Sequence, residues 1–315
     1  MTTMSTDTLK DLYSKHTGYA SDKWDIYLTE YQRLLAPLRD LPVELLEIGV
    51  QNGGSLSIWE QYFHNAKLLV GCDINPACSK LCYPGEVIKL VIGDVTQEDA
   101  RSEVLSYSSQ FNIIIDDGSH TSSDIIQSFF QFFPYLKNGG LYIVEDLHCS
   151  YWKRFQGGLF HPASSVAFFK TLVDILNFEH WGLELTREDI LAPFSIPSDL
   201  KTAFLADIHS IEFINSMCII TKKPAAQNLL GVRHISGNED KVSPVMQVSG
   251  TFNKAQPQQT TGTTLLNKNV ESNLLQAQIE LKVKERFIAN QREKIVSLET
   301  SQRELKKEIS DLKSS

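Results

Sequence analysis

The sequence predicts an α/β fold in which a mostly parallel, Rossmann-like sheet carries helices on both faces. Between residues 45 and 223, short apolar runs alternate with amphipathic stretches, which is typical of strands joined by crossover helices. The first run ends in a glycine-rich turn that opens a helix, as dinucleotide-type folds do. A pair of apolar runs separated by only two residues closes the region and predicts an antiparallel edge.

The predicted strands are short, apolar and bounded by polar residues. The parallel ones are residues 45–49, 67–73, 88–93, 111–116 and 141–145. The closing hairpin is predicted from residues 208–214 and 217–222, with Asn215 and Ser216 as its turn. A helix over 55–63 follows the first strand.

Composition divides the chain into four predicted regions. Residues 1–40, rich in Tyr, Trp and Lys and helical over 8–38, form an N-terminal cap, and residues 41–223 form the sheet domain. Residues 224–269 are dominated by Gln, Thr, Asn, Ser and Gly without periodicity, which predicts a poorly ordered linker. Residues 270–315 are regular again and predict an α-helical coiled coil.

The coiled-coil prediction depends on apolar residues that recur with a heptad spacing. The seam consists of Leu274, Leu281, Ile288, Ile295, Leu298, Leu305, Ile309 and Leu312, with Lys284, Gln291 and Gln302 as its polar breaks. We expect it to make the protein a homo-oligomer or to tether it to another protein. The alternative is a single amphipathic helix that packs on the sheet domain. Because the seam still runs at the last residues, the chain is also expected to be part of a longer protein.

Bulk properties exclude several classes of protein. Hydrophobic residues make up 42% of the chain and charged residues 22%, which is ordinary for a globular protein. No apolar run approaches the roughly 20 residues that span a bilayer, and residues 1–13 lack the apolar core of a secretion signal. The five cysteines are scattered without a zinc pattern, so we expect free thiols in the cytoplasm. A net charge of −8 argues against nucleic acid as a partner.

The glycine-rich turn is the first candidate binding element. Its residues are Gly49, Gly53, Gly54 and Ser55. Glycine is expected there because a side chain would keep a ligand from the backbone, and the following helix N-terminus supplies free N–H groups. The turn alone does not distinguish a dinucleotide from other nucleoside ligands.

Acids at the strand ends favour S-adenosylmethionine as the cofactor. Asp73, which Ile74 follows, stands where a carboxylate accepts ribose hydroxyls, and Asp94 where one accepts an adenine amino group. Glu47 lies on the first strand, and a turn surrounded by acids suits the ammonium and sulfonium of S-adenosylmethionine better than the pyrophosphate of NAD. The alternative is that Asp73 and Asp94 are ordinary helix caps.

A second acidic cluster follows the fourth and fifth strands. The fourth ends in Asp116 and Asp117, with His120 three residues later, and the fifth ends in Glu145 and Asp146. These ends are side by side in a parallel sheet, so the carboxylates would repel one another unless protonated or bridged by a cation. Hard oxygen ligands select Mg²⁺, Mn²⁺ or Ca²⁺. Strand alternation establishes only that one of Asp116 and Asp117 faces the crevice.

Such a metal site predicts transfer of a methyl group to a hydroxyl. A sugar alcohol is a poor nucleophile near neutral pH, and coordination to a metal lowers the pKa of a bound oxygen. His120 would take the proton, whereas a capping or surface role is its alternative. The other histidines without acidic neighbours are expected to be structural: His16, His64, His161 and His234.

Four segments resemble those of metal-dependent sugar O-methyltransferases. They are residues 67–73, IIDDGSH at 114–120, FFPYLKNGG at 132–140 and VEDLHCSYW at 144–152. This family includes macrolide and anthracycline-type deoxysugar methyltransferases and bacterial relatives often labelled cephalosporin hydroxylase-like. The resemblance covers about residues 11–223 and implies a class I methyltransferase fold that uses S-adenosylmethionine. The linker and coiled coil lie outside it, and they are expected to tether the enzyme to another enzyme of a glycan pathway.

The resemblance also implies roles for single residues. Asp117, Glu145 and Asp146 would hold Mg²⁺ or Mn²⁺, and His120 would be the general base. Asp116 would then belong to the cofactor side. The aromatic pair Tyr151 and Trp152 is expected either to floor the acceptor pocket or to pack in the core. Residues matching the family's usual opening are Lys15, Trp24, Tyr27 and Tyr31.

Three functions compete at this stage. The first is methylation of a sugar hydroxyl on a glycoconjugate, polysaccharide or glycosylated natural product. The second is a catechol-type O-methyltransferase, because a catechol would chelate the same ion. The third is a non-catalytic scaffold that works through its coiled coil. The intact set of Asp117, His120, Glu145 and Asp146 argues against this third function.

Overall fold

The fold was analysed in a computed structural model of the 315-residue chain. The structure describes residues 7–182, 185–194, 196–197, 200, 202–255, 284, 288, 291–298 and 301–302. The chain divides into two compact units, Met1–Gln259 and Thr260–Ser315.

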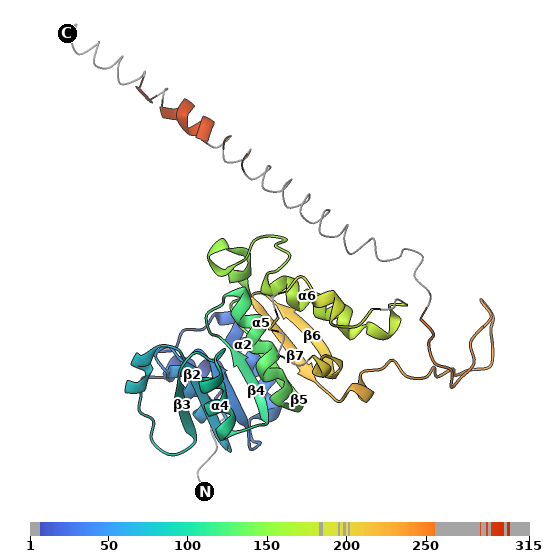
Figure 1. Cartoon of the computed structure of the whole chain (residues 1–315), viewed down its shortest axis with the longest axis horizontal. Helices are drawn as coiled ribbons and strands as arrows, with labels where there is room; N and C mark the ends of the chain where they lie inside the picture. The colour runs from blue at the N-terminus through green and yellow to red at the C-terminus, as the bar shows by residue number, and fades with distance from the viewer. Residues whose placement is uncertain are drawn as a thin grey trace. The chain divides into compact units, whose positions relative to one another are not determined.

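The first unit is built on a seven-stranded sheet (Figure 1). Its strands are β1 Glu44–Ile48, β2 Leu68–Asp73, β3 Ile88–Ile92, β4 Phe111–Asp116, β5 Leu136–Val144, β6 Ile208–Ile214 and β7 Met217–Lys222. Their order is β3-β2-β1-β4-β5-β7-β6. The first five run parallel, and β7 pairs antiparallel with both β5 and β6. The expected Rossmann-like sheet with an antiparallel edge hairpin is therefore confirmed.

Helices cover both faces of the sheet. They are α1 Leu9–Lys15, α2 Asp25–Leu35, α3 Gly54–Tyr62, α4 Glu98–Tyr107, α5 Ser122–Phe132 and α6 Ser165–Leu176. Helices α4, α5 and α6 share one buried cluster, and Figure 1 shows α4 and α5 along that face. The first three helices share the other. Strand β4 divides its side chains between the clusters, with Ile114 in one and Ile113 and Ile115 in the other, as strand alternation requires.

The strand predictions match the structure closely except at β5. Four of the predicted parallel strands agree with the observed bounds to within one residue at each end. Strand β5 begins at Leu136, five residues before the predicted start, because its register to β4 shifts between Phe111 and Ile113. Gly139, with φ +82°, lies in this irregular stretch. An irregular register accommodates the extra residues, and an apolar pattern does not reveal it.

The predicted N-terminal helix over 8–38 is wrong in its middle. Helix α1 ends at Lys15 and α2 begins only at Asp25, which leaves residues 16–24 as an irregular segment. Gly18 lies in this segment, and a Cβ there would stand 2.9 Å from the imidazole of His16. We call residues 16–24 the N-terminal strap, because they return to the candidate site.

The C-terminal predictions are only partly covered by the structure. Residues 225–255 contain the short 3₁₀ turn Ala225–Gln227 and an isolated bridge between Val232 and Phe252. In the second unit, residues 291–298 are helical, and Ile295 and Leu298 are more than half exposed. Much of the predicted seam lies outside the described residues, namely Leu274, Leu281, Leu305, Ile309 and Leu312. The coiled coil stays a prediction.

Two further expectations concern the cysteines and the membrane. The cysteines are free thiols, and Cys82 is exposed while the other four are buried. Within the described part of the chain, no helix combines the length and the hydropathy needed to span a bilayer.

Candidate functional site

The candidate site lies at the carboxyl edge of the parallel strands, where β1 and β4 are neighbours. The chain runs from β1 through β2 to β3 on one side, and from β4 to β5 on the other. At such a reversal the following loops turn in opposite directions and leave a crevice. A cavity of about 420 Å³ opens at this position, which is within the range of small-molecule sites.

Most of the residues predicted for the site line this cavity. Those that do are Gly49, Ser55, Asp73, Ile74, Asp94, Asp116, Asp117, His120 and Asp146. The other four, Glu47, Gly53, Gly54 and Glu145, are not among the described residues that line it. The sheet therefore brings the two acidic clusters of the sequence to one cavity, as predicted.

The glycines of the turn are required by the protein's own packing. Gly49 has φ +90°, and a Cβ there would lie 2.0 Å from the backbone oxygen of Asp117. At Gly53 a Cβ would lie 2.1 Å from the hydroxyl of Tyr83, and at Gly54 it would lie 2.2 Å from the carbonyl oxygen of Tyr19. From the sequence, glycine was expected at these positions because a ligand would need the space beside the backbone. In the structure, the backbone after β4, a neighbouring tyrosine and the N-terminal strap occupy it.

Gly49→Ala should therefore cost more than a positive φ alone. A non-glycine residue in a left-handed conformation costs about 1–2 kcal/mol, and forced packing costs a further 1–3 kcal/mol or so. Gly85 is the matched control, because it has the same φ of +90° with nothing within 4 Å of its Cβ position. Denaturant unfolding should show a clearly larger loss for Gly49→Ala than for Gly85→Ala. Equal losses in the free energy of unfolding would mean that the backbone at Asp117 moves away from the new Cβ at little cost.

Asp73 shapes the turn as well as lining the cavity. Its Oδ2 accepts the backbone N–H groups of Val50 and Gln51, each at 2.8 Å, and its Oδ1 accepts that of Asn75 at 2.8 Å. Asp94 makes a local turn by accepting the backbone N–H and the hydroxyl of Thr96 at 2.9 and 2.7 Å. The alternative that both are ordinary helix caps is wrong, because Asn75 is the N-cap of the 3₁₀ helix Pro76–Lys80 and Gln97 is the N-cap of α4. Asp73 and Asp94 instead brace local turns, and both line the cavity.

Two buried carboxyls support the site from below. Glu47 accepts hydrogen bonds from the Ser55 hydroxyl at 2.8 Å and the Trp59 indole at 3.4 Å. Burial is the main cause that raises the pKa of Glu47 to about 7, against the lowering effect of Lys23. Asp116 accepts from the Tyr142 hydroxyl at 3.3 Å, and burial likewise raises its pKa to about 7. Both acids therefore carry a proton more readily than an exposed acid does.

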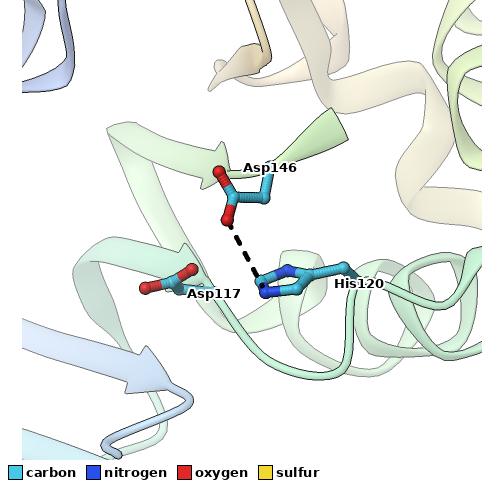
Figure 2. A group of neighbouring side chains, drawn as sticks. All are labelled: Asp117, His120 and Asp146. Atoms are coloured by element: carbon cyan, nitrogen blue, oxygen red, sulfur yellow. Dashed lines mark ion pairs between the residues drawn. The ribbon is translucent and has the colours of Figure 1, made fainter. Parts of the chain in front are cut away.

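The tips of β4 and β5 bring two acids and a histidine together (Figure 2). Asp117, His120 and Asp146 each offer one ligand atom, and these atoms lie within 4.8 Å of one another. His120 Nε2 is 3.7 Å from Asp146 Oδ2. Asp117 follows β4 and Asp146 follows β5, and the two strands are paired neighbours. The predicted convergence of acidic strand ends is found, with His120 in this group and Glu145 outside it.

The backbone at this group is held in an uncommon conformation. His120 and Asp146 have φ values of +57° and +52°. Such conformations are rare for residues other than glycine and cluster at functional sites. Asp146 is fixed by its neighbours, because its Oδ1 accepts from the Tyr27 hydroxyl at 2.9 Å and the Trp24 indole at 3.0 Å. The Tyr27 hydroxyl also lies 3.0 Å from the carbonyl oxygen of Ser216, so its single O–H is shared between the two acceptors and the β6–β7 turn takes part in this support.

Lys23 is a functional candidate that the sequence argument missed. Its ammonium pairs with Asp117 and, at 2.7 Å, with Glu145 Oε1. Tyr31 donates to the same oxygen of Glu145 at 2.5 Å. The Lys23 side chain is only 3% exposed. Burial by itself would lower the pKa of Lys23, but the carboxylates of Glu145, Asp117 and Glu47 together raise it well above its usual value.

The Lys23 pairs change the charge of the predicted metal site. Two of its acids, Asp117 and Glu145, share the charge of one lysine, and Asp146 is bonded to neutral donors. The available signal was weak: a lysine beside Trp24 in a segment that Gly18 interrupts. Because Lys23 is 94 and 122 residues away from its two partners, no local pattern could have joined them.

Aromatic side chains continue from the site to the surface. The ring of His148 lies 6.0 Å from that of Trp24 and 5.0 Å from that of Trp152, and Trp152 lies 6.1 Å from Phe155. Phe155 is in turn 6.3 Å from His120. Trp24 and Trp152 are 59% and 52% exposed. We call these four residues (Trp24, His148, Trp152 and Phe155) the aromatic rim. Of the expected pair, Tyr151 and Trp152 are both exposed, so neither is a core residue.

Comparison with known proteins identifies a methyltransferase domain in this chain and a solved structure with a similar fold. Residues 46–147 match the family model described as a methyltransferase domain. The chain is similar to the solved structure of the MycE methyltransferase from the mycinamycin biosynthetic pathway, in complex with Mg, SAH and mycinamycin VI. That similarity has a TM-score of 0.57 and 24% identity, and it covers 70% of this chain and 55% of that one. It establishes a Rossmann-like methyltransferase fold.

Relatives of known activity are also similar in sequence. The chain is 38% identical over 169 residues to 8-demethyl-8-alpha-L-rhamnosyl tetracenomycin-C 2′-O-methyltransferase of Streptomyces olivaceus, covering 50% of this chain and 44% of the relative. It is 33% identical over 183 residues to demethylmacrocin O-methyltransferase of Streptomyces fradiae, covering 54% and 45%. It is 30% identical over 218 residues to mycinamicin VI 2′′-O-methyltransferase of Micromonospora griseorubida, covering 65% and 52%. The chain thus spans about half the length of the relatives it matches.

Proposed function

We propose that this protein transfers the methyl group of S-adenosylmethionine to a sugar hydroxyl of a glycosylated small molecule, with a divalent metal ion in its site. The observation that carries the proposal is one cavity with two chemical ends. Asp73 and Asp94 lie at the tips of β2 and β3, on one side of β1, and line one end. Asp117, His120 and Asp146 follow β4 and β5 on the other side of β1 and meet at the other end. A methyl donor and a metal-held acceptor need such neighbouring sites.

The residues at the second end fit a hard cation. Asp117 and Asp146 offer carboxylate oxygens, which Mg²⁺ and Mn²⁺ prefer, whereas a histidine nitrogen is the poorer ligand for Mg²⁺. We therefore assign the two acids as metal ligands and leave His120 for proton transfer. Both contacts of Glu145 described above fall on Oε1, which leaves Oε2 as the atom through which Glu145 would join them. When bound, the ion lowers the pKa of a coordinated hydroxyl.

His120 is placed to accept the acceptor's proton. Its imidazole stands at the cavity wall, with Nε2 3.7 Å from Oδ2 of Asp146, where a hydroxyl held by the proposed metal ligands would lie within its reach. Tyr27 and Trp24 hold Asp146 in one orientation, so the histidine and the metal ligands keep a fixed geometry. In-line displacement at a methyl carbon depends on such positioning.

The first end of the cavity fits the nucleoside of the donor. Asp73 would accept a ribose hydroxyl through Oδ1, which takes only one of its three backbone bonds described above. Asp94 would accept the adenine amino group through Oδ2, since both of its bonds to Thr96 fall on Oδ1. Ile74, which lines the cavity and is 69% exposed, would lie against the adenine ring. The acids of the lining favour a donor that carries a sulfonium over one that carries a pyrophosphate.

The aromatic rim favours a carbohydrate acceptor. Exposed rings of Trp24 and Trp152 beside the metal ligands offer flat apolar surfaces with polar edges, which suit the C–H face of a sugar and its hydroxyls. The names of the relatives agree, because one acts on a rhamnosyl tetracenomycin at its 2′ oxygen. A catechol would coordinate the same metal, but it would leave most of the rim uncovered.

An acceptor assay tests the proposal. The purified protein is incubated with methyl-labelled S-adenosylmethionine, Mg²⁺ and either a rhamnosylated aromatic polyketide, its aglycone or a catechol. We expect label in the rhamnosylated compound alone, in an alkali-stable ether on the sugar. Methylation of the catechol but not the sugar would replace the proposal with the second function. No transfer to any hydroxyl, although the donor binds, would contradict it.

A further inference from the structure

The cavity is lined by many carboxylates and by a lysine. Its acidic lining residues are Asp22, Asp73, Asp94, Asp116, Asp117, Asp124 and Asp146. Among the described residues that line it, Lys23 is the one lysine or arginine. S-adenosylmethionine carries an ammonium and a sulfonium, which suit this lining, and also a carboxylate, which the acids repel. An acidic cavity for this donor therefore needs a cation for one end of it.

Lys23 has a hydrogen bond to spare. A lysine ammonium has three N–H donors. The structure shows one directed to Asp117 and one to Glu145 Oε1, which leaves the third for a further acceptor. Lys23 is also one of the residues that line the cavity. Since the side chain is 3% exposed, solvent screens this charge little.

The N-terminal strap holds Lys23 in place from both sides. On one side Gly54 donates its backbone N–H to the carbonyl of Ala20 at 3.1 Å, and the Tyr19 hydroxyl accepts from the backbone N–H of Cys82 at 3.0 Å. On the other side Trp24 is bonded to Asp146. The strap thus lies between the glycine-rich turn and the metal ligands, where the amino-acid end of the donor would have to lie.

We propose that Lys23 binds the carboxylate of the donor's amino-acid end with its third N–H and thereby ties the donor to the metal carboxylates. The proposal rests on the proposed function and names a binding residue for its cofactor. It also explains why a lysine is buried among metal ligands. Lys23 also balances part of the negative charge of Asp117 and Glu145, but a lysine used for that alone would compete with the metal ion for the same carboxylates.

Removal of the donor's carboxylate gives a direct test by calorimetry. S-adenosylmethionine and its decarboxylated form share the adenosine, the sulfonium and an amine, and differ in the carboxylate. A hydrogen bond between two charged groups predicts that the wild-type protein binds S-adenosylmethionine about 10- to 100-fold more tightly than the decarboxylated compound. Both are measured with EDTA present, so that the metal does not enter the comparison.

Variants of Lys23 assign the preference to its ammonium. In Lys23→Met the affinity ratio should fall to one or below, and in Lys23→Arg it should stay within a few-fold of the wild-type ratio. Lys10→Met removes another paired lysine, 61% exposed and paired with Asp25, and should leave the ratio unchanged. An unchanged ratio in Lys23→Met, or a wild-type ratio near one, would overturn the proposal.

Two results keep the test decisive in other cases. If Lys23→Met does not fold, a Lys23→Arg protein that folds and has lost the preference would overturn the proposal, and one that keeps it supports it. If the wild-type protein binds neither compound nor S-adenosylhomocysteine, the proposed function itself fails. That failure is distinct from binding of all three without preference, which would remove Lys23 alone.

Discussion

His120→Ala is expected to lower the rate of methyl transfer by about 10²–10⁴-fold, the range that a general base contributes. The imidazole borders the cavity 3.7 Å from Asp146, and His120 is the one histidine among the described residues that line it. Donor affinity should change little, because Asp73 and Asp94 lie at the other end of the cavity. Single-turnover rates and calorimetry with S-adenosylhomocysteine measure the two effects separately.

The matched control for this change is His234→Ala. His234 is exposed and outside the sheet, and its removal should leave both rate and affinity as they are. A His120→Ala protein with full activity would exclude His120 from proton transfer. A protein that loses donor affinity together with its rate would make His120 a structural residue, which its positive φ also allows.

Removal of the metal is expected to have an effect of similar size. Treatment with EDTA should lower activity by about 100-fold or more, since metal coordination supplies several kcal/mol to such reactions. Added Mg²⁺ or Mn²⁺ should restore it. In Asp146→Asn, which keeps the shape of the side chain and its bonds to Tyr27 and Trp24, the metal concentration for half-maximal activity should rise strongly.

A second variant separates loss of the metal from loss of shape. Asp124 also lines the cavity, but it is bonded to Ser119 and lies outside the group of Asp117, His120 and Asp146. Asp124→Asn should leave the metal requirement unchanged. Activity that is indifferent to EDTA in the wild-type protein would end the metal model.

The sheet was predictable because its strands are set by local patterns. Buried runs such as Ile113–Ile114–Ile115 are apolar on both faces and end abruptly in acids, so β4 and its tip were placed to the residue. The hairpin of β6 and β7 followed from its two-residue turn, and Ser216 takes the positive φ that such a turn requires. Parallel connection then brings the acidic strand ends together without further information.

The parts that were missed depend on contacts between distant segments. The N-terminal strap interrupts a stretch that looks helical, and its course is set by Gly54, Cys82 and Asp146. The partners of Lys23 lie 94 and 122 residues further along. Gly53 and Gly54 lie at the start of α3 but are not among the described residues that line the cavity, and the groups that fill the space beside them could not be deduced from the turn itself.

The sequence predicted that the acidic tips of β4 and β5 converge, but not which side chains each carboxylate contacts. A cluster of carboxylates on two adjacent strand ends requires a positive charge, and the sequence argument supplied only a metal ion. The structure adds a lysine to Asp117 and Glu145, and it groups His120 with Asp117 and Asp146. The set of metal ligands therefore depends on which of these carboxylates bind the ion and which stay paired with Lys23.

Anomalous scattering from Mn²⁺ tests most directly which carboxylates hold the metal ion. Crystals grown with S-adenosylhomocysteine and MnCl₂ should show one manganese peak between the carboxylates of Asp117 and Asp146, at the end of the cavity away from Asp94. The same crystals of Asp146→Asn should lose it. No peak at this position, with the wild-type carboxylates balanced only by Lys23 while the donor site is filled, would contradict the proposed metal centre.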